Sequence, residues 1–493
     1  MDLSPRARYA LIIDGQQVEA ASGETFTVIN PATNEALATF AKGGPEDVDR
    51  AVDAARRAME GKWGRLRPAD RTRLLYRLAA AMADHAADLA RLETLNVGKA
   101  ISSTYAEVYS AIEELEFFAG LARAAGEAFP LAGSLQVMTQ RDPVGVCALI
   151  VPWNYPIMLT GWKLAPALAA GNAVVVKPAS ATPITALMLA ELALEVGFPP
   201  GVINVVTGPG STVGDALVTH PGVAKISFTG ETETGKNIMR KAAGDLKRVS
   251  LELGGKSPNL VFEDVDIEAT AAASVWAIFY SAGQSCEARS RLFVHKSIYD
   301  RFLDAFVSAT RRLVVGDPLD RNTHVGALIS PQQVERVDGY VKLALEEGGR
   351  VLAGGSRPDD AALARGNFYL PTVIEGLGNH SRVCQEEIFG PVVAVQPFAD
   401  EDEAVRLAND TQFGLAATVF TRDAARALRV ARSIKAGTVT VNTPFTSFAG
   451  VPFGGFKASG FGRERALETL HLYTETRSVI INTGKGPHNP FGL

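Results

Sequence analysis

The sequence has few cysteines and no long apolar or basic run. Its three cysteines among 493 residues are too few for a disulfide framework, which is typical of a reducing compartment. No apolar stretch reaches the ~20 residues that span a bilayer, and the first residues carry no basic-then-apolar targeting pattern. A net charge of −5 without a Lys/Arg run excludes a nucleic-acid footprint. We therefore expect a cytoplasmic protein that binds neither nucleic acid nor membrane.

The sequence also shows no metal-binding motif and no internal repeat. The seven histidines show no metal-ligand spacing, so we expect no metal. The composition, 47% hydrophobic and 21% charged, is that of an ordinary globular protein. At 493 residues the chain is too long for one core, and two or three domains are expected.

From residue 144 onward, short apolar runs alternate with segments of helical periodicity. This alternation predicts βαβ units and a parallel sheet, with ligands bound beyond the carboxyl ends of the strands. The alternation resumes after residue 256, which indicates a second α/β domain. The strands expected in the first domain are residues 146–151, 173–177, 202–207 and 225–229. Residues 45–59, 68–96 and 102–125 precede them and read as long helices.

One carboxylate and one thiol lie 34 positions apart (286 − 252) in the segment 251–291. Glu252 is a candidate base and Cys286 a candidate nucleophile. Glycines 254, 255 and 283 flank them and permit unusual backbone conformations and close approach. The alternative is a buried structural cysteine and a solvated helix charge.

Three loops after strands are candidate binding sites. The glycine-rich turn 208–214 has a G-x-G start with one residue too many before its last glycine, which is a weak dinucleotide signal. The turn 228–235 opens a helix, whose free N–H groups suit a pyrophosphate. Asn154 stands between two prolines after the first strand, and a stiffly held amide is what an oxyanion hole needs. For all three loops the alternative is an ordinary turn.

Together, the motifs of this sequence resemble those of the aldehyde dehydrogenase superfamily over nearly the whole chain. The matching segments, in order, are PWNYP (152–156), KPAS (177–180), FTG (228–230), LELGGK (251–256), GQSC (283–286), EEIFGP (386–391) and PFGGFKASG (452–460). The resemblance implies an α/β fold of two Rossmann-like parallel-sheet domains with a small β oligomerisation flap.

The resemblance also implies a mechanism. Cys286 as thiolate would attack an aldehyde, and the Asn154 amide with the Cys286 N–H would stabilise the oxyanion. Hydride transfer to NAD or NADP would leave a thioester, which water activated by Glu252 would hydrolyse. Lys163 and Glu464 match the proton-relay positions around that base.

Further positions are assigned by the glycine turns and by the resemblance. Those expected to contact the cofactor are Trp153, Lys177, Ser180, Gly210, Gly214, Phe228, Thr229, Gly230, Glu231, Leu253, Glu387 and Phe389. Those expected to line an apolar substrate tunnel are Leu159, Trp162, Phe448 and Phe453.

Three residues leave questions of specificity open. Ser180 replaces the glutamate of NAD-specific members, which removes repulsion toward a 2′-phosphate, so we expect NADP to be tolerated or preferred. Glu231 stands where many members have serine, and it suits a helix start. Glu287, beside the nucleophile, has three possible roles: it selects a cationic aldehyde, points into solvent, or pairs with Arg289 or Arg291. The apolar tunnel favours aliphatic or aromatic aldehydes.

The resemblance predicts the domain division and the assembly. Residues 1–124 and 144–254 would bind the dinucleotide, and residues 255–460 would form the catalytic domain. The segments 125–143 and 461–485 would bridge subunits of a homodimer or homotetramer. Two alternatives are a CoA-acylating relative, against which Glu252 argues, and a non-catalytic, crystallin-like binding protein.

Overall fold

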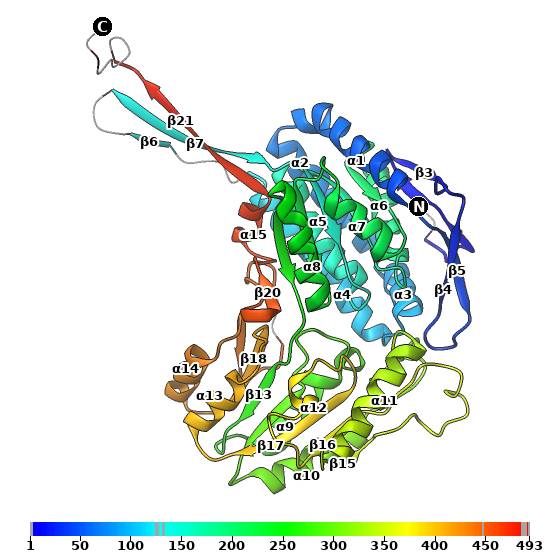
Figure 1. The fold of residues 1–493 in the computed structure, drawn as a ribbon, viewed down its shortest axis with the longest axis vertical. Coiled ribbons are helices and arrows are strands. Elements are labelled where there is room, and N and C mark those ends of the chain that lie inside the picture. Colours follow the sequence, from blue (N-terminus) through cyan, green and yellow to red (C-terminus); the bar gives the residue numbers. More distant parts are fainter. Residues whose placement is uncertain (1–2, 124–127, 131–133, 446–447, 485–490, 492–493) are drawn as a thin grey trace.

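Two mainly parallel sheets form the two lobes of the protein, and a long β-arm projects from the first lobe (Figure 1). The computed structural model describes residues 3–123, 128–130, 134–445, 448–484 and 491. A small sheet of β1 (Arg8–Tyr9), β5 (Ala36–Ala41) and β4 (Thr25–Ile29) lies along the edge of the first lobe. The predicted α/β fold with parallel-sheet domains is confirmed.

The first sheet contains the predicted βαβ units. Its strands, in spatial order, are β20 (Gly460–Phe461), β12 (Arg248–Glu252), β11 (Lys225–Thr229), β8 (Val146–Ile150), β9 (Ala173–Lys177), β10 (Ile203–Val205), β2 (Leu11–Ile13) and β3 (Gln16–Val18). The strands from β12 to β10 run parallel. The chain goes from β8 out to β10 and then returns to β11 on the other side of β8. This reversal creates the crevice beyond the strand ends where such sheets bind ligands.

Helices cover both faces of this sheet, so every residue of β8 is buried. Cys147 and Leu149 pack toward one set of helices, whereas Val146, Ala148 and Ile150 pack toward the other, as the alternation of a strand requires. The first set is α2 (Pro68–Asp84), α3 (Ala86–Val97), α4 (Ile101–Leu121), α5 (Pro156–Ala170) and α6 (Ile184–Glu195). The second set is α1 (Pro45–Glu60), α7 (Asp215–Thr219) and α8 (Thr232–Ala242).

The single helix predicted over residues 68–96 is wrong, because α2 and α3 are separate helices. His85 leaves the helical conformation with φ −108° and ψ 16°, and it ends α2 and begins α3. Apolar residues continue on both sides of this break, so the periodicity alone does not show it. None of the helices in the described ranges is both long and apolar enough to cross a membrane.

The second sheet is also mainly parallel and is covered on both faces. Its strands, in spatial order, are β15 (Arg350–Ala353), β16 (Thr372–Glu375), β17 (Val392–Phe398), β14 (Arg291–His295), β13 (Pro258–Val261), β18 (Ala416–Phe420) and β19 (Thr438–Val441). Its helices are α9 (Ile267–Phe279), α10 (Tyr299–Arg311), α11 (Pro331–Glu346), α12 (Arg382–Gln385), α13 (Glu401–Asn409) and α14 (Ala424–Ser433). The loop that carries Cys286 precedes β14, and therefore lies at the amino edge of this sheet.

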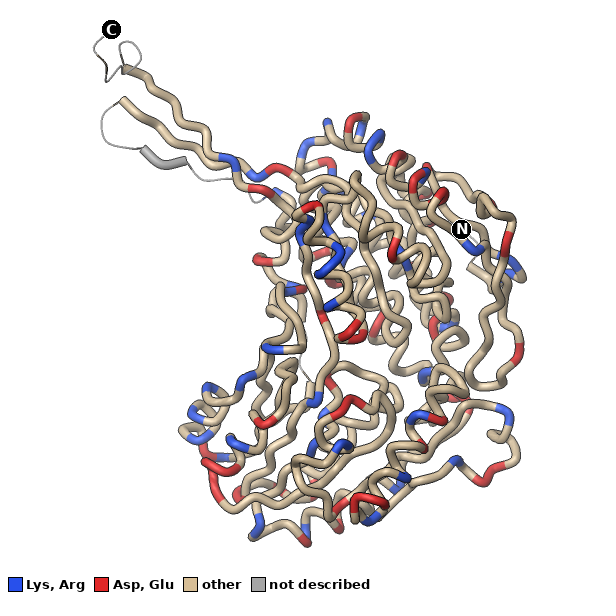
Figure 2. Tube along the Cα trace, viewed as in Figure 1, with Lys and Arg blue, Asp and Glu red and all other residues tan. Residues whose placement is uncertain are grey.

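The arm consists of β21 (Thr474–Asn482), β7 (Leu135–Pro143) and β6 (Ala128–Pro130), and the short helix α15 (Leu467–Leu472) precedes it. β21 pairs antiparallel with β7 along its whole length. Figure 2 shows that charged residues lie near the base of the arm and that its outer part carries none among the described residues. Residues 125–127, 131–133 and 485 of the predicted bridging segments lie outside the described chain.

Candidate active site

A cavity of about 310 Å³ lies at the carboxyl ends of β8 and β11, where the strand order reverses. It is lined by Pro152, Trp153, Asn154, Thr229, Gly230, Glu231, Leu253, Gly254, Cys286, Gln333, Arg336, Glu387 and Phe389. These residues come from loops of both lobes. Eight predicted cofactor or catalytic positions of the list therefore meet Cys286 in one place: Trp153, Asn154, Thr229, Gly230, Glu231, Leu253, Glu387 and Phe389.

Cys286 lies in a tightly bent loop after α9. Ser281 and Ala282 have φ of 53° and 54°, and Gly283 has φ of 69°, so three successive residues adopt the left-handed conformation. Such strain in non-glycine residues concentrates at functional sites. A Cβ on Gly255 would stand 2.2 Å from the Cys286 carbonyl oxygen, so only glycine permits this approach. The loop thus needs the glycines that the sequence provides.

The Cys286 thiol is electrostatically disfavoured as an anion in the free protein. Burial raises its pKa well above the ordinary value, and the carboxylates of Glu287, Glu387 and Glu252 raise the pKa further. A positive charge brought close to the sulfur would reverse part of this effect.

The Asn154 amide is tied to the loop of the nucleophile. Its Nδ2 donates to the backbone carbonyl of Gln284 at 2.9 Å. An amide nitrogen carries two hydrogens, so the second N–H has a fixed direction beside Cys286. Local sequence fixes this loop, because Pro156 begins α5 and Gly171, in the left-handed conformation, ends it.

Glu252 ends β12 and is buried without a hydrogen-bond partner for either carboxylate oxygen among the described residues. Burial raises its pKa well above the ordinary value, and Glu464 raises the pKa further, whereas Lys163 and Arg463 oppose this. A Cβ on Gly454 would approach Glu252 Oε1 to 2.8 Å, which places the carboxyl group against the segment that carries Glu464. A raised pKa makes the deprotonated carboxylate a stronger base, which suits Glu252 to accept a proton from water.

Lys163 and Glu464 form a buried ion pair close to Glu252. Lys163 Nζ donates to Glu464 Oε1, and both side chains are almost fully inaccessible to solvent. Glu464 is held by two backbone hydrogen bonds with Phe453, of 2.8 and 3.0 Å.

Glu387 and Phe389 also line the cavity. Glu387 Oε1 accepts the Gly255 N–H at 2.9 Å, and burial raises the pKa of Glu387 to about 7. Phe389 has φ of 61° and packs edge-on against Trp153, with ring centroids 5.2 Å apart. Gln333 and Arg336 of α11 donate to the backbone carbonyls of residues 387–389 and hold this strained segment.

Five predicted cofactor positions do not line this cavity. Phe228 is buried beneath Gly230. Lys177 ends β9, and burial lowers its pKa to about 8. The Ser180 hydroxyl donates to the Gly208 carbonyl at 2.9 Å. Gly210 and Gly214 bound a short π-helical turn that leads into α7. Lys177, Ser180 and this turn follow β9 and β10 and extend the crevice beyond the cavity.

Glu231 is the residue that precedes the first turn of α8. It is exposed, and its carboxylate accepts the Thr234 hydroxyl at 3.3 Å. Glu231 thus occupies the N-cap position of α8, where a negative charge is favoured, but its side chain makes no capping hydrogen bond.

Cys286 also packs against an apolar cluster. Three of the four predicted tunnel residues, Leu159, Trp162 and Phe453, belong to it. Tyr155, Leu415, Met158 and Tyr280 complete the cluster, and the sequence reasoning missed them. The aromatic residue after Asn154 was a signal for Tyr155. The fourth predicted residue, Phe448, is 59% exposed and lies outside the cluster.

Glu287 pairs with Arg289, which was one of its predicted roles. Arg289 Nη1 lies 3.0 Å from Glu287 Oε2 and 2.5 Å from the Glu287 carbonyl oxygen. Arg289 is itself buried, with its guanidinium 5.0 Å from the Phe445 ring centroid.

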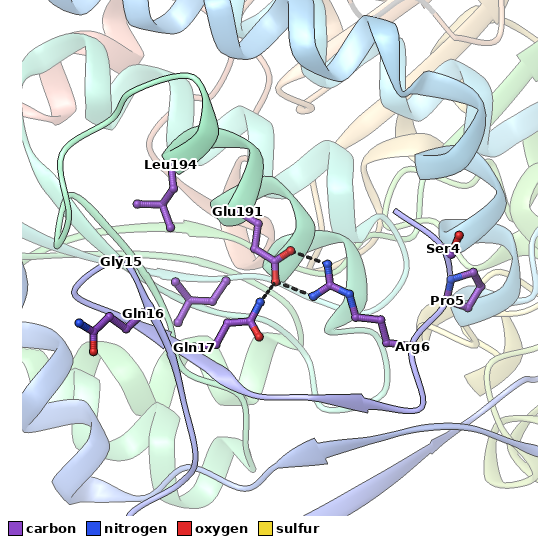
Figure 3. A pocket seen from close by; sticks show the side chains of 9 residues that line it. Ser4, Pro5, Arg6, Gly15, Gln16, Gln17, Glu191 and Leu194 are labelled. Carbon is purple, nitrogen blue, oxygen red and sulfur yellow. Dashed lines mark hydrogen bonds and ion pairs between the residues drawn. The ribbon is translucent and has the colours of Figure 1, made fainter. Parts of the chain in front are cut away.

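A second cavity, of about 560 Å³, lies between the amino-terminal segment and α6 (Figure 3). Arg6 donates to both carboxylate oxygens of Glu191 at 2.8 and 2.7 Å, and Gln17 donates to the same group at 2.7 Å. Its described lining residues include no cysteine or histidine. Arg6, Gln17 and Glu191 thus satisfy one another, and the cavity holds no nucleophile–base pair comparable to Cys286 and Glu252 among its described residues.

Comparison with known proteins gives one family. The profile of the "Aldehyde dehydrogenase family" matches residues 18–479. A betaine aldehyde dehydrogenase of Bacillus subtilis (strain 168) is 42% identical over 485 residues, which cover 98% of this chain and 99% of the relative. A betaine aldehyde dehydrogenase of Mesorhizobium japonicum is 44% identical and covers 96% of this chain and 97% of its own.

Solved structures agree with this result. A betaine aldehyde dehydrogenase from Staphylococcus aureus in complex with NAD+ has a TM-score of 0.96 and 40% identity, covering 98% of this chain and 97% of its own. PnpE in complex with nicotinamide adenine dinucleotide has a TM-score of 0.96 and 44% identity, covering 98% of this chain and 100% of its own.

Proposed function

Because the chain belongs to the aldehyde dehydrogenase family, we propose that Cys286, Asn154 and Glu252 carry out its reaction. The reaction is the oxidation of an aldehyde to a carboxylic acid. The hydrogen bond from Asn154 Nδ2 to the Gln284 carbonyl carries the proposal, because it aims an amide at the neighbourhood of the nucleophile.

In the proposed mechanism, the Cys286 thiol releases its proton to solvent, and Sγ as thiolate bonds to the aldehyde carbon. The second Asn154 N–H and the Cys286 N–H stabilise the negative charge that develops on the oxygen. A nicotinamide cofactor, when bound, accepts the hydride. Glu252 then removes a proton from water, which attacks the Cys286 thioester and releases the acid and the thiol. The Lys163–Glu464 pair would pass that proton onward.

The residues of the crevice suit a dinucleotide. Thr229 Oγ1 is buried without a partner among the described residues, as a donor reserved for a ligand would be. Glu387 and Phe389 would hold the nicotinamide riboside, and Lys177 the adenosine side. NADP use remains our proposal: with serine at position 180, no carboxylate opposes a 2′-phosphate near Lys177.

We propose a neutral aliphatic or aromatic aldehyde as the substrate. The apolar cluster supports this, and Arg289 balances the charge of Glu287. Two aromatic walls already hold cations: Lys99 lies 4.0 Å from the Tyr155 ring centroid, and Arg465 lies 4.5 Å from that of Trp162. A ring that holds one cation attracts a second less strongly. Betaine aldehyde is the second candidate, favoured by the similarity to betaine aldehyde dehydrogenases.

An aldehyde panel tests these proposals. Purified protein is assayed for NAD(P)H formation with propanal, benzaldehyde and betaine aldehyde, each with and without CoA. We expect CoA-independent turnover, with higher kcat/KM for the neutral aldehydes. Turnover that requires CoA would contradict the role of Glu252, and a preference for betaine aldehyde would select the second candidate.

We further propose that residues 1–124 and 144–254 bind the dinucleotide, that 255–460 form the catalytic domain, and that 125–143 and 461–485 join subunits of a homodimer or homotetramer. The uncharged outer part of the arm, with Ile480 65% exposed, supports the last point. The three free cysteines accord with a cytoplasmic location.

A further inference from the structure

A buried lysine lies directly behind the loop that carries Asn154. Lys99, in the turn between α3 and α4, is 1% exposed. Its Nζ lies 2.5 Å from each carboxylate oxygen of Glu107 and 2.5 Å from the backbone carbonyl oxygen of Asn154. The ammonium group also lies over the Tyr155 ring. It therefore connects a helix of the first lobe to the backbone of the proposed oxyanion site.

The same loop is held at its other end by a buried carboxylate. Glu93 of α3 accepts the Ile157 N–H at 2.9 Å and the Thr185 hydroxyl at 2.7 Å. A cation thus binds a carbonyl at residue 154, and an anion binds an amide at residue 157. The charged groups that face Lys99 are Glu107 and Glu93.

These contacts are costly to form. A lysine and a carboxylate removed from water lose favourable hydration, and a hydrophobic pair of similar volume often gives equal or greater stability. The pair is therefore poorly explained by stability alone. What it adds is a fixed position for the Asn154 backbone, from which the side-chain amide reaches the loop of Cys286.

We propose that Lys99 is a positioning residue for aldehyde oxidation. By holding the Asn154 carbonyl, Lys99 fixes the position of the side-chain amide. The N–H of that amide donates a hydrogen bond to the oxyanion that forms from the aldehyde. The inference rests on the proposed role of Asn154. If Lys99 acts only in this way, its loss has no further effect once the Asn154 amide is absent.

A double-mutant cycle tests this coupling. The rate of the first NADH burst is measured at saturating NAD+ and aldehyde in Lys99→Met, Asn154→Ala and the combined variant. Asn154→Ala should slow the burst by ~10²–10³-fold, the usual effect of losing one oxyanion donor. Lys99→Met should slow it by up to ~10²-fold through misplacement of the amide. The combined variant should match Asn154→Ala within about twofold.

The outcomes separate the two proposals. If the Lys99→Met and Asn154→Ala effects multiply, Lys99 does not act through Asn154 and the inference is overturned. If Asn154→Ala leaves the burst rate unchanged, the oxyanion role of Asn154 itself is wrong, and the inference fails with it.

Stability requires its own control, because Lys99→Met leaves Glu107 buried without its cation. The variant Lys99→Met/Glu107→Met removes both charges. We expect its Tm to return toward that of the wild type, whereas its burst rate should stay as slow as that of Lys99→Met. Recovery of the rate together with Tm would show that Lys99 only supports the fold, and would overturn the inference.

Lys247 offers a matched control. Its side chain is 2% exposed and also donates to two backbone carbonyls, those of His220 at 2.6 Å and Val223 at 3.0 Å. It has no contact with the Asn154 loop among its hydrogen bonds. Lys247→Met should keep the burst rate within about twofold, by the additivity of distant sites. In Lys99→Met, KM for NAD+ should also stay within that factor while the burst slows.

Discussion

Replacing Glu252 with glutamine separates the two halves of the proposed reaction. The substitution keeps the size of a side chain that is buried at the end of β12. Formation of the thioester does not need the carboxylate, but its hydrolysis does. We therefore expect one NADH per Cys286 in a first burst at about the wild-type rate, followed by nearly complete arrest.

The expected loss of turnover in Glu252→Gln follows from the role of Glu252 as the general base of hydrolysis. A general base contributes ~10²–10⁴-fold to the step that it assists, which corresponds to about 3–5 kcal/mol of barrier. Stopped-flow absorbance of NADH resolves the burst from the slow phase. The thioester that accumulates is detected as a mass increase on the protein after acid quench.

The stability of the same variant has a predictable sign. Burial raises the pKa of Glu252 above its ordinary value of 4.5, so the folded protein binds this proton more tightly than the unfolded chain. The resulting contribution is fully present below pH ~4.5 and is lost as pH rises toward the folded pKa. Glutamine does not titrate and does not lose this contribution. The Tm of Glu252→Gln minus the Tm of the wild type should therefore increase as pH rises from 4.5.

Two results would refute this reasoning. Steady turnover at the wild-type rate without a burst would exclude Glu252 as the base of hydrolysis. A Tm difference independent of pH would show that the carboxyl group ionises normally in the folded protein.

Three other predictions test separate features. Because burial and, next, nearby carboxylates raise the pKa of Cys286, its alkylation by iodoacetamide should still accelerate above pH 8, and a plateau below pH 7 would contradict this. Ser180→Glu should raise the ratio of kcat/KM for NAD over NADP by ~10-fold, the effect of one unpaired charge contact, and an unchanged ratio would remove Ser180 from cofactor choice. Ile480→Glu on the arm should give a smaller species in sedimentation velocity, and an unchanged mass would exclude this strand from the subunit contact.

The site residues that the sequence predicts best lie at the ends of strands. Asn154, Glu252 and the glycine turns stand beside regular apolar strands, and parallel strands bring their carboxyl ends to one edge, so their meeting was predictable. The break at His85 was not, because apolar periodicity continues across it. The apolar cluster was found only in part: Leu415 comes from a distant segment, and packing between distant segments leaves no periodic signal.

The buried ion pair of Lys99 and Glu107 could not be predicted from the sequence, for a different reason. Lys99 and Glu107 are eight positions apart, and charges on helices are usually solvated. Their burial depends on the Asn154 carbonyl, which belongs to another element and supplies the third contact. A buried ion pair is therefore specified by a partner that the local sequence does not contain.

Glu287 shows how one contact decides between two readings of the same residue. A free carboxylate beside the nucleophile would favour a cationic aldehyde, but Arg289 lies 3.0 Å away and balances its charge. Arg289 is itself held by Thr418, whose hydroxyl accepts from Nε at 3.0 Å, and by the Phe445 ring. Turning Glu287 toward a substrate would leave the buried Arg289 guanidinium without its counter-charge. The free-energy cost of that unpaired charge is larger than the gain from pairing Glu287 with a solvent-exposed cationic substrate. We therefore propose that the apolar cluster around Trp162 and Phe453 selects the aldehyde.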